Sequence, residues 1–150
     1  MTTPKLFIGI DPGVSGGIAV SRDGVMTACK MPETPHDVAD VLRQEIGSSS
    51  CLVTIEQVGP MPKQGVSSTF KFGRSYGFLE GVLVGLQVPY QFATPQKWQK
   101  AMNCMTKGDK NVSKAAAQRR WPKQTITHAK ADAMLICQYA VEMFDGREAR

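Results

Sequence analysis

Three acidic residues stand where the sequence predicts that two strands end and a helix begins. Asp11 and Glu56 end apolar runs over residues 5–11 and 51–56, and Asp132 falls in the first turn of the last predicted helix. If the two strands are sheet neighbours, their carboxylates meet at one edge and cannot all stay charged without a cation between them. Oxygen-only ligands select hard ions, which predicts a Mg²⁺ site that Mn²⁺ can also fill. Such ions bind a phosphodiester and lower the pKa of an attacking water, so these acids are candidate catalytic and metal-binding residues.

Each acid also has an ordinary structural role open to it. Asp11 could accept backbone N–H bonds in the turn at 12–17, and Glu56 could be a surface charge at a strand end. Asp132 could interact with the positive end of a helix dipole. A single shared site accounts for all three residues at once, and we favour it.

The basic residues are gathered in the middle of the chain. Residues 61–123 carry eleven Lys and Arg against two Asp and Glu, whereas residues 1–60 carry four against seven. Among these bases lie the aromatic residues Phe70, Phe72, Tyr76, Trp98 and Trp121. This mixture is typical of a surface that binds a phosphate backbone and exposed bases; the alternative is a solvated basic face without a partner. We therefore expect a negatively charged partner.

The elements that must position the acids form one α/β domain over residues 1–150. Apolar runs separated by turn residues predict strands, the first three antiparallel, at 5–11, 16–21, 25–31, 51–56 and 88–93. Helical spacing and cap residues predict helices at 35–46, 73–87, 95–102, 111–121 and 129–144, with a long loop at 57–72. Three antiparallel strands joined to a buried parallel pair make a mixed five-stranded sheet with helices on both faces.

Composition limits the class of protein. At 42% hydrophobic and 21% charged residues, the chain has the proportions of a globular protein and not of a disordered or fibrous one. No apolar run reaches the roughly 18 residues of a membrane span, and no signal peptide is predicted. The four cysteines lie in separate segments without a CxxC pair, so we expect them to be reduced and mostly buried. We expect a cytoplasmic protein with no membrane partner.

Glycines recur at every fourth position of the helix predicted over 73–87, at Gly73, Gly77, Gly81 and Gly85. Each costs a helix up to ~1 kcal/mol relative to alanine, so another backbone is expected to approach closely along this stripe. Two interpretations stay open, a homodimer contact and tight packing on the sheet.

Three motifs in order resemble the RuvC-type Holliday junction resolvases of the RNase H-like nuclease superfamily, nearest to phage or phage-derived members. They are FIGIDPGVSGG at Phe7 to Gly17, VTIE at Val53 to Glu56, and ADAMLI at Ala131 to Ile136. The resemblance covers nearly the whole chain. It implies an RNase H-like fold and a homodimeric, Mg²⁺-dependent endodeoxyribonuclease that binds a four-way DNA junction and nicks two opposed strands during recombination and repair.

The sequence departs from this family at one position. The family carries a fourth ligand, an acid or occasionally a histidine, three residues before the last aspartate, which here is Ala129. Alanine cannot bind a metal. Three explanations stay open: His128 takes the role as a ligand or a base, Ala129 replaces a native aspartate in an inactive variant, or three acids suffice. His128 could also be an ordinary helix-cap residue.

The resemblance also implies DNA contacts. The segment after Glu56 could enter the junction, and Phe70 or Phe72 could stack on an unpaired base; Phe70 as an ordinary core residue is the alternative. The candidate contacts are Lys63, Gln64, Ser67, Phe70, Lys71, Phe72, Arg74, Lys107, Lys110, Ser113 and Lys114. Lys107 or Lys110 could stabilise charge on the scissile phosphate. Trp98 and Trp121 are expected to be core residues.

Three other functions are weighed against the resolvase. The segment at 11–17 also resembles the phosphate loop of actin-like and sugar-kinase ATPases, but those chains are far longer and carry a second such loop, so no nucleotide cofactor is expected. Ala129 leaves open a junction-binding protein without activity. A nuclease of the same fold that acts on RNA–DNA hybrids or flaps is the third alternative.

Overall fold

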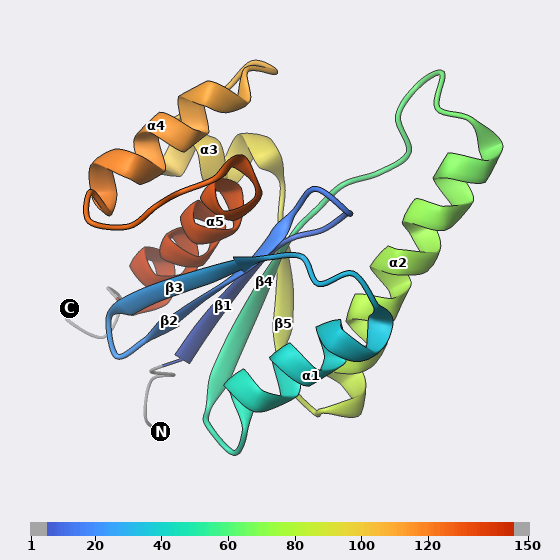
Figure 1. Cartoon of the computed structure of the whole chain (residues 1–150), viewed down its shortest axis with the longest axis horizontal. Helices are drawn as coiled ribbons and strands as arrows, with labels where there is room; N and C mark the ends of the chain where they lie inside the picture. The colour runs from blue at the N-terminus through green and yellow to red at the C-terminus, as the bar shows by residue number, and fades with distance from the viewer. Residues whose placement is uncertain (1–5, 146–150) are drawn as a thin grey trace.

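The computed structural model describes residues 6–145, and its centre is a five-stranded mixed sheet with strand order β3-β2-β1-β4-β5 (Figure 1). The strands are β1 (Leu6–Asp11), β2 (Gly17–Arg22), β3 (Val25–Lys30), β4 (Cys51–Glu56) and β5 (Tyr90–Ala93). β1, β2 and β3 pair antiparallel, while β4 is parallel to both β1 and β5. The predicted α/β fold with a mixed sheet is confirmed.

Helices cover both faces of the sheet, because the side chains of each buried strand alternate between two apolar cores. Leu6, Ile8 and Ile10 of β1 pack under α1 (Pro35–Ile46) and α2 (Val66–Gly85). Phe7 faces the other core, which α3 (Pro95–Ala101), α4 (Lys110–Arg120) and α5 (His128–Phe144) complete. Figure 1 shows these two helix layers on opposite sides of the sheet.

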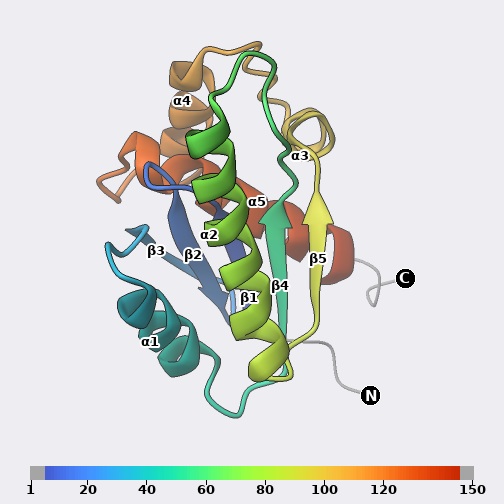
Figure 2. The same cartoon turned by 90° about the vertical axis from the view of Figure 1, so that its right-hand side faces the viewer.

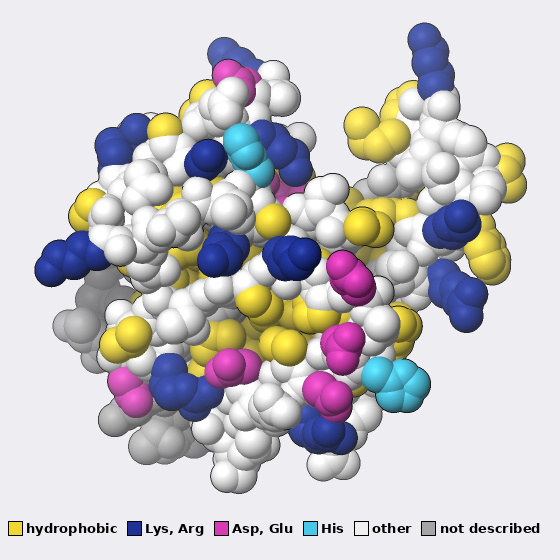
Figure 3. All heavy atoms as spheres, in the orientation of Figure 1, with side chains coloured by type: hydrophobic (Ala, Val, Ile, Leu, Met, Phe, Trp, Pro, Cys, Tyr) yellow, Lys and Arg dark blue, Asp and Glu magenta, His cyan; other side chains and the backbone are white. Residues whose placement is uncertain are grey.

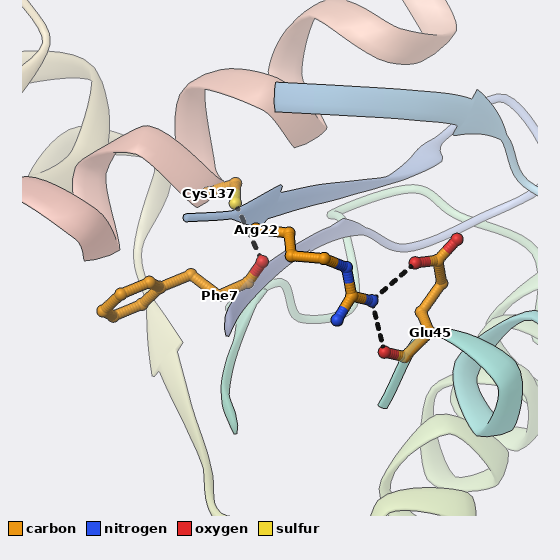
Figure 4. Close-up of polar contacts among 4 residues, drawn as sticks. All are labelled: Phe7, Arg22, Glu45 and Cys137. Carbon is orange, nitrogen blue, oxygen red and sulfur yellow. Dashed lines mark hydrogen bonds and ion pairs between the residues drawn. The ribbon is translucent and has the colours of Figure 1, made fainter. Parts of the chain in front are cut away.

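Two glycines let α5 approach the sheet closely. A Cβ atom at Gly9 would meet backbone atoms of Cys137 and Ala133, and one at Gly17 would meet the carbonyl oxygen of Ala129. The Cys137 thiol donates to the Phe7 carbonyl at 3.3 Å, across the same contact (Figure 4). The close approach predicted for the stripe in α2 therefore occurs here instead.

The other face is joined to the sheet by a contact at the end of β2. The Arg22 guanidinium donates to both the carbonyl and the carboxylate of Glu45 in α1, at 2.7 and 3.1 Å (Figure 4). Both side chains are partly exposed, so the ion pair contributes at most about 1 kcal/mol. The buried strands and not this pair fix the position of α1.

The second helix begins earlier than predicted. α2 starts at Val66 and not at Gly73, and the loop before it is confined to 57–65. Residues 66–72 contain no Gly or Pro to break the helix, and the Thr69 hydroxyl donates to the Gly65 carbonyl at 2.9 Å. Ser67, Phe70 and the residues around them are therefore helical. Figure 2 shows this end of α2 extending past the ends of β4 and β5.

The glycine stripe of α2 faces no other part of the described chain. A Cβ atom added at any of its four glycines would meet nothing within 4 Å, and Val84 beside them is 62% exposed. Tight packing of this stripe on the sheet is therefore wrong. The homodimer interpretation stays a prediction.

No helix among residues 6–145 combines the length and apolar character needed to cross a membrane. The predicted burial of the cysteines is confirmed for Cys51, Cys104 and Cys137, while Cys29 is partly exposed. Other predicted boundaries shift by one or two residues, as for β5, which begins at Tyr90 instead of Val88.

Candidate active site

Asp11 and Glu56 end two neighbouring parallel strands. β1 and β4 pair up to Ile10 and Ile55, so the next residue of each strand is an acid, and both acids point to the same face of the sheet. That is the face on which Gly9 contacts α5. Asp11 is 7% exposed and Glu56 is 9% exposed. The structure thus brings together the two carboxylates that the strand ends predicted.

α5 supplies the third acid. Asp132 lies near the start of this helix and is 8% exposed. The tight contact of Gly9 and Gly17 with the α5 backbone holds the helix against the middle of β1 and the start of β2. Asp132 is therefore presented to Asp11 and Glu56 from the helix layer.

Charges of neighbouring acids raise the free energy of the charged forms of Asp11 and Glu56. Burial, and then the charges of Glu56 and Asp132, raise the pKa of Asp11 to about 7. Burial also raises the pKa of Glu56, against a hydrogen bond from Trp98 that lowers it. Lys110 lowers both pKa values by its charge. The site is a buried cluster of negative charge with one nearby lysine that partly compensates it.

Protein groups leave most of these carboxylate oxygens unpaired. Among the hydrogen bonds of residues 6–145, the carboxylates of Asp11 and Asp132 accept none, and Glu56 accepts one, from Trp98. No enclosed side-chain oxygen in that part of the chain lacks a partner, so the unpaired oxygens are open to solvent. Buried carboxylates without protein donors, open on one side, fit a hard divalent cation in donor chemistry and charge.

As they stand, no three His, Cys, Asp or Glu side chains within residues 6–145 are close enough together to hold a metal ion. The donor types fit a cation, but the side chains do not converge on one point. Asp11, Glu56 and Asp132 remain the residues that could hold it.

Trp98 is a site residue that the sequence analysis missed. Its indole Nε1 donates to Glu56 Oε2 at 2.7 Å, and Trp98 is fully buried. The prediction that it is a core residue is correct but incomplete. The sequence does contain a signal for this contact, because a buried indole N–H needs an acceptor. β5 leads into α3, and the neighbouring strand β4 ends in the carboxylate of Glu56. Tyr76 of α2 also contacts this strand end, donating to the Glu56 carbonyl at 3.0 Å.

No protein-family model matches the sequence, and no curated protein matches it. Solved structures do match. Thermus thermophilus RuvC is 17% identical with a TM-score of 0.61 and 96% of each chain covered. T. thermophilus RuvC in complex with Holliday junction substrate gives 17% identity and a TM-score of 0.64, covering 95% of this chain and 96% of that one. The yeast mitochondrial Holliday junction resolvase is 15% identical with a TM-score of 0.44, covering 93% and 77%. The chain has the RuvC fold.

His128 and Ala129 begin the last helix of this RuvC fold. His128 Nε2 lies 3.0 Å from Asn111 Oδ1, which links the starts of α5 and α4. That nitrogen is occupied by a protein partner, so a metal or base role for His128 would fall to Nδ1 or require this contact to open. Ala129 is half-buried, and its carbonyl contacts Gly17.

The lysines predicted to contact DNA are divided between the surface and the site. Lys107 and Lys110 are exposed around Gly108, and Lys110 is the one whose charge acts on Asp11 and Glu56. Lys114 is half-buried. Ser113 is 1% exposed and donates to the Lys110 carbonyl at 3.2 Å, so its hydroxyl does not face a ligand.

The remaining predicted DNA contacts lie on residues 57–74, which we call the α2 arm. Phe70 is 70% exposed, which rules out a core role for it within residues 6–145. Phe72 is half-buried and stacks on Tyr76. The exposed residues of the arm include Lys63, Ser67, Lys71 and Arg74, whereas the Gln64 side chain accepts from the Met61 N–H at 3.2 Å. Figure 3 shows the surface hollowed beside this arm, with Lys and Arg side chains on both sides of the hollow.

Proposed function

We propose that this chain is a structure-specific endodeoxyribonuclease that resolves four-way and other branched DNA as a homodimer, with Mg²⁺ as its cofactor. The observation that carries the proposal is the cluster of buried carboxylates of Asp11, Glu56 and Asp132, two of which no protein donor within residues 6–145 satisfies. The cluster lies at the ends of the parallel strands of a RuvC fold. A RuvC of that fold is known in complex with Holliday junction substrate.

The residues of the site have different roles in the proposed phosphodiester hydrolysis. A divalent cation supplies Lewis-acid chemistry, polarising the phosphate and making water a better nucleophile. Asp11 and Glu56, at the ends of β1 and β4, and Asp132, on α5, are the residues that would hold that cation. Lys110 acts electrostatically on Asp11 and Glu56, so its ammonium is placed to stabilise negative charge that grows on a bound phosphate.

The basic surface supports a nucleic-acid substrate. Within residues 6–145, Arg120 is the one base of the 61–123 segment that pairs with a carboxylate, that of Glu142. The other bases are free to neutralise phosphates. The exposed ring of Phe70, near the start of α2, offers a stacking surface for an unpaired base.

The exposed face of α2 supports the homodimer. A Cβ atom added at any of its four glycines would meet no atom of residues 6–145 within 4 Å, and apolar Val84 and Phe92 nearby are 62% and 37% exposed. A second copy packed backbone to backbone along this face would cover apolar surface and explain why glycine is used there. We also propose a cytoplasmic location, which the free cysteines support.

The same site supports a second candidate, a junction-binding protein without cleavage activity. Ala129 stands where resolvases carry a ligand, and the acids do not converge on one point. A natural three-acid enzyme and a variant that has lost an aspartate at this position share this structure, so activity has to decide between them.

The test compares this chain with Ala129→Asp and Asp11→Asn. Each protein is given a labelled four-way junction and a linear duplex, with cleavage measured in Mg²⁺ and binding in Ca²⁺. We expect all three to bind the junction in preference to the duplex and Asp11→Asn to cut nothing, since it removes charge from the site and leaves the basic surface intact. Cleavage by Ala129→Asp alone would identify position 129 as the missing ligand.

Other outcomes decide against parts of the proposal. Equal binding to junction and duplex contradicts the branched-DNA substrate. Junction binding with no cleavage by either this chain or Ala129→Asp favours the inactive binding protein. Cleavage that persists in Asp11→Asn contradicts the carboxylate site.

A further inference from the structure

Within residues 6–145, Trp98 makes the one hydrogen bond to a side-chain carboxylate of the site. Its ring is fully buried at the centre of α3, and its indole N–H donates to Glu56 Oε2 at 2.7 Å. An indole N–H is a donor only, and leaving it buried without an acceptor is unfavourable. The Glu56 carboxylate is therefore held in one orientation by a rigid partner that gains from keeping it there.

The second oxygen of the same carboxylate is left open. Within residues 6–145, Glu56 Oε1 accepts no hydrogen bond, and no enclosed side-chain oxygen there is without a partner. Oε1 is consequently reachable from solvent. The two oxygens of one carboxylate have different roles: Oε2 is bound to the protein and Oε1 is available to a ligand.

We propose that Trp98 is a positioning residue that presents Glu56 to a divalent cation through Oε1 alone, and that it thereby favours Mg²⁺ and Mn²⁺ over Ca²⁺. This inference rests on the proposed function, because it concerns the same carboxylate site.

The selectivity follows from how these ions are coordinated. Ca²⁺ takes six to eight oxygen ligands and often binds both oxygens of a carboxylate, whereas Mg²⁺ keeps a near-octahedral shell and uses one or two carboxylates. A Glu56 carboxylate whose Oε2 is hydrogen-bonded to Trp98 suits binding of Mg²⁺ through one oxygen. The same hydrogen bond resists the rotation needed to bind Ca²⁺ through both oxygens. Removing the indole N–H frees Oε2. The affinity for Ca²⁺ should then fall little, whereas the affinity for Mg²⁺ should fall because the Glu56 carboxylate is no longer held in orientation.

The experiment measures binding of Mg²⁺, Mn²⁺ and Ca²⁺ to the full chain by titration calorimetry, without DNA. The chain has two tryptophans, so Trp121→Phe leaves Trp98 as the single tryptophan. In that background Trp98 is replaced by benzothienylalanine, which keeps the ring shape and puts sulfur where the indole has N–H. Groups behind a metal ligand typically contribute about 10–100-fold to affinity, so we expect Mg²⁺ and Mn²⁺ to bind at least about tenfold more weakly. Ca²⁺ is expected to change much less.

The ratio of the Mg²⁺ and Ca²⁺ affinities distinguishes positioning from simple loss of packing. Trp121→Phe alone is the matched control, since Trp121 packs against the same core but donates to no carboxylate among the described residues; its ratio should equal that of the parent. Trp98→Phe, which also removes the N–H, should shift the ratio in the same direction as the analogue even if its melting temperature falls. An unchanged ratio in both Trp98 variants overturns the inference, as does an equal loss of all three ions.

The parent and Asp11→Asn separate this failure from failure of the proposed function. A parent that binds no divalent ion, or binds it as well after Asp11→Asn, contradicts the metal site itself. A parent that binds Mg²⁺ and loses it in Asp11→Asn, while both Trp98 variants keep the parental ratio, contradicts the role of Trp98 only.

Discussion

Asp11 is expected to destabilise the metal-free protein at alkaline pH. Its pKa rises from 3.8 to about 7 through burial and the charges of Glu56 and Asp132. The folded state therefore holds the proton more tightly than the unfolded state, and the free energy of unfolding falls as pH rises from about 4 to about 7. Roughly three pKa units at 1.36 kcal/mol each give about 4 kcal/mol as the largest cost of ionising Asp11 above that range.

Asp11→Asn removes this cost while keeping the shape of the side chain. At pH 8 without divalent ions, we expect the variant to be more stable than the parent by up to about 4 kcal/mol. For a chain of this size that is a rise of about 8–16 °C in melting temperature at most, from about 2–4 °C per kcal/mol. The advantage should disappear below about pH 4, where Asp11 is protonated in both states. Thermal and urea unfolding followed by circular dichroism across this pH range measure it.

Asp23→Asn is the matched control, because it makes the same change at an exposed residue in the β2–β3 turn, where φ is 51° and asparagine is tolerated. It should leave the pH dependence of stability unchanged. Excess Mg²⁺ should then raise the melting temperature of the parent at pH 8 and leave Asp11→Asn nearly unaffected, since binding to the folded state alone stabilises it. An Asn variant less stable than the parent at pH 8, or a gap that does not change with pH, would refute the electrostatic account of the site.

Three further predictions concern the surface around the site. Gly81→Ala should stabilise a monomer by up to ~1 kcal/mol, since its Cβ meets nothing within 4 Å, but should weaken a dimer packed along α2; sedimentation at several concentrations and thermal melts measure both, and a tighter dimer argues against this contact. Lys110→Ala should slow cleavage by about 100–1000-fold and weaken junction binding far less, whereas exposed Lys97→Ala should do neither; an equal loss of binding and rate would make Lys110 only a phosphate contact. Phe70→Ala should reduce the preference for a junction over linear duplex by about 1–3 kcal/mol of binding free energy, the usual value of one stacked base, and gel-shift titration with both DNAs would detect an equal loss that contradicts stacking.

The sheet and the acidic site could be predicted because their signals are local and mutually consistent. Short β-branched runs bounded by turn residues mark the strands, and an acid at the end of two parallel strands is brought to one edge by register alone. The placement of Asp132 is a longer inference. It depends on glycines in β1 and β2 that let α5 approach the sheet, and their partners lie more than 100 residues away in the chain.

The start of α2 and the role of Trp98 could not be predicted for two different reasons. Residues 57–72 are rich in Gly, Pro, Lys, Gln and Ser, which predicts a loop, but residues 66–72 contain no Gly or Pro, so the helix begins at Val66 and Phe70 is an exposed helical residue. The prediction that Trp98 is a core residue is confirmed by its burial. Which polar atom its N–H finds is decided by the packing of α3 beside β4, which no pattern in residues 95–101 contains.

Folding places the acidic and basic segments of the chain next to each other. The acids of the site come from the two acidic ends of the sequence, and the bases from its middle. The fold sets Lys110, the first residue of α4, near Asp11 and Glu56, while one further base of that segment, Arg120, pairs with a carboxylate within residues 6–145. A single lysine offsets only part of three buried carboxylates, so the site keeps a net negative charge inside a basic surface. A basic surface attracts a polyanion and a negative site attracts a cation, which is the charge order that metal-assisted phosphodiester cleavage requires.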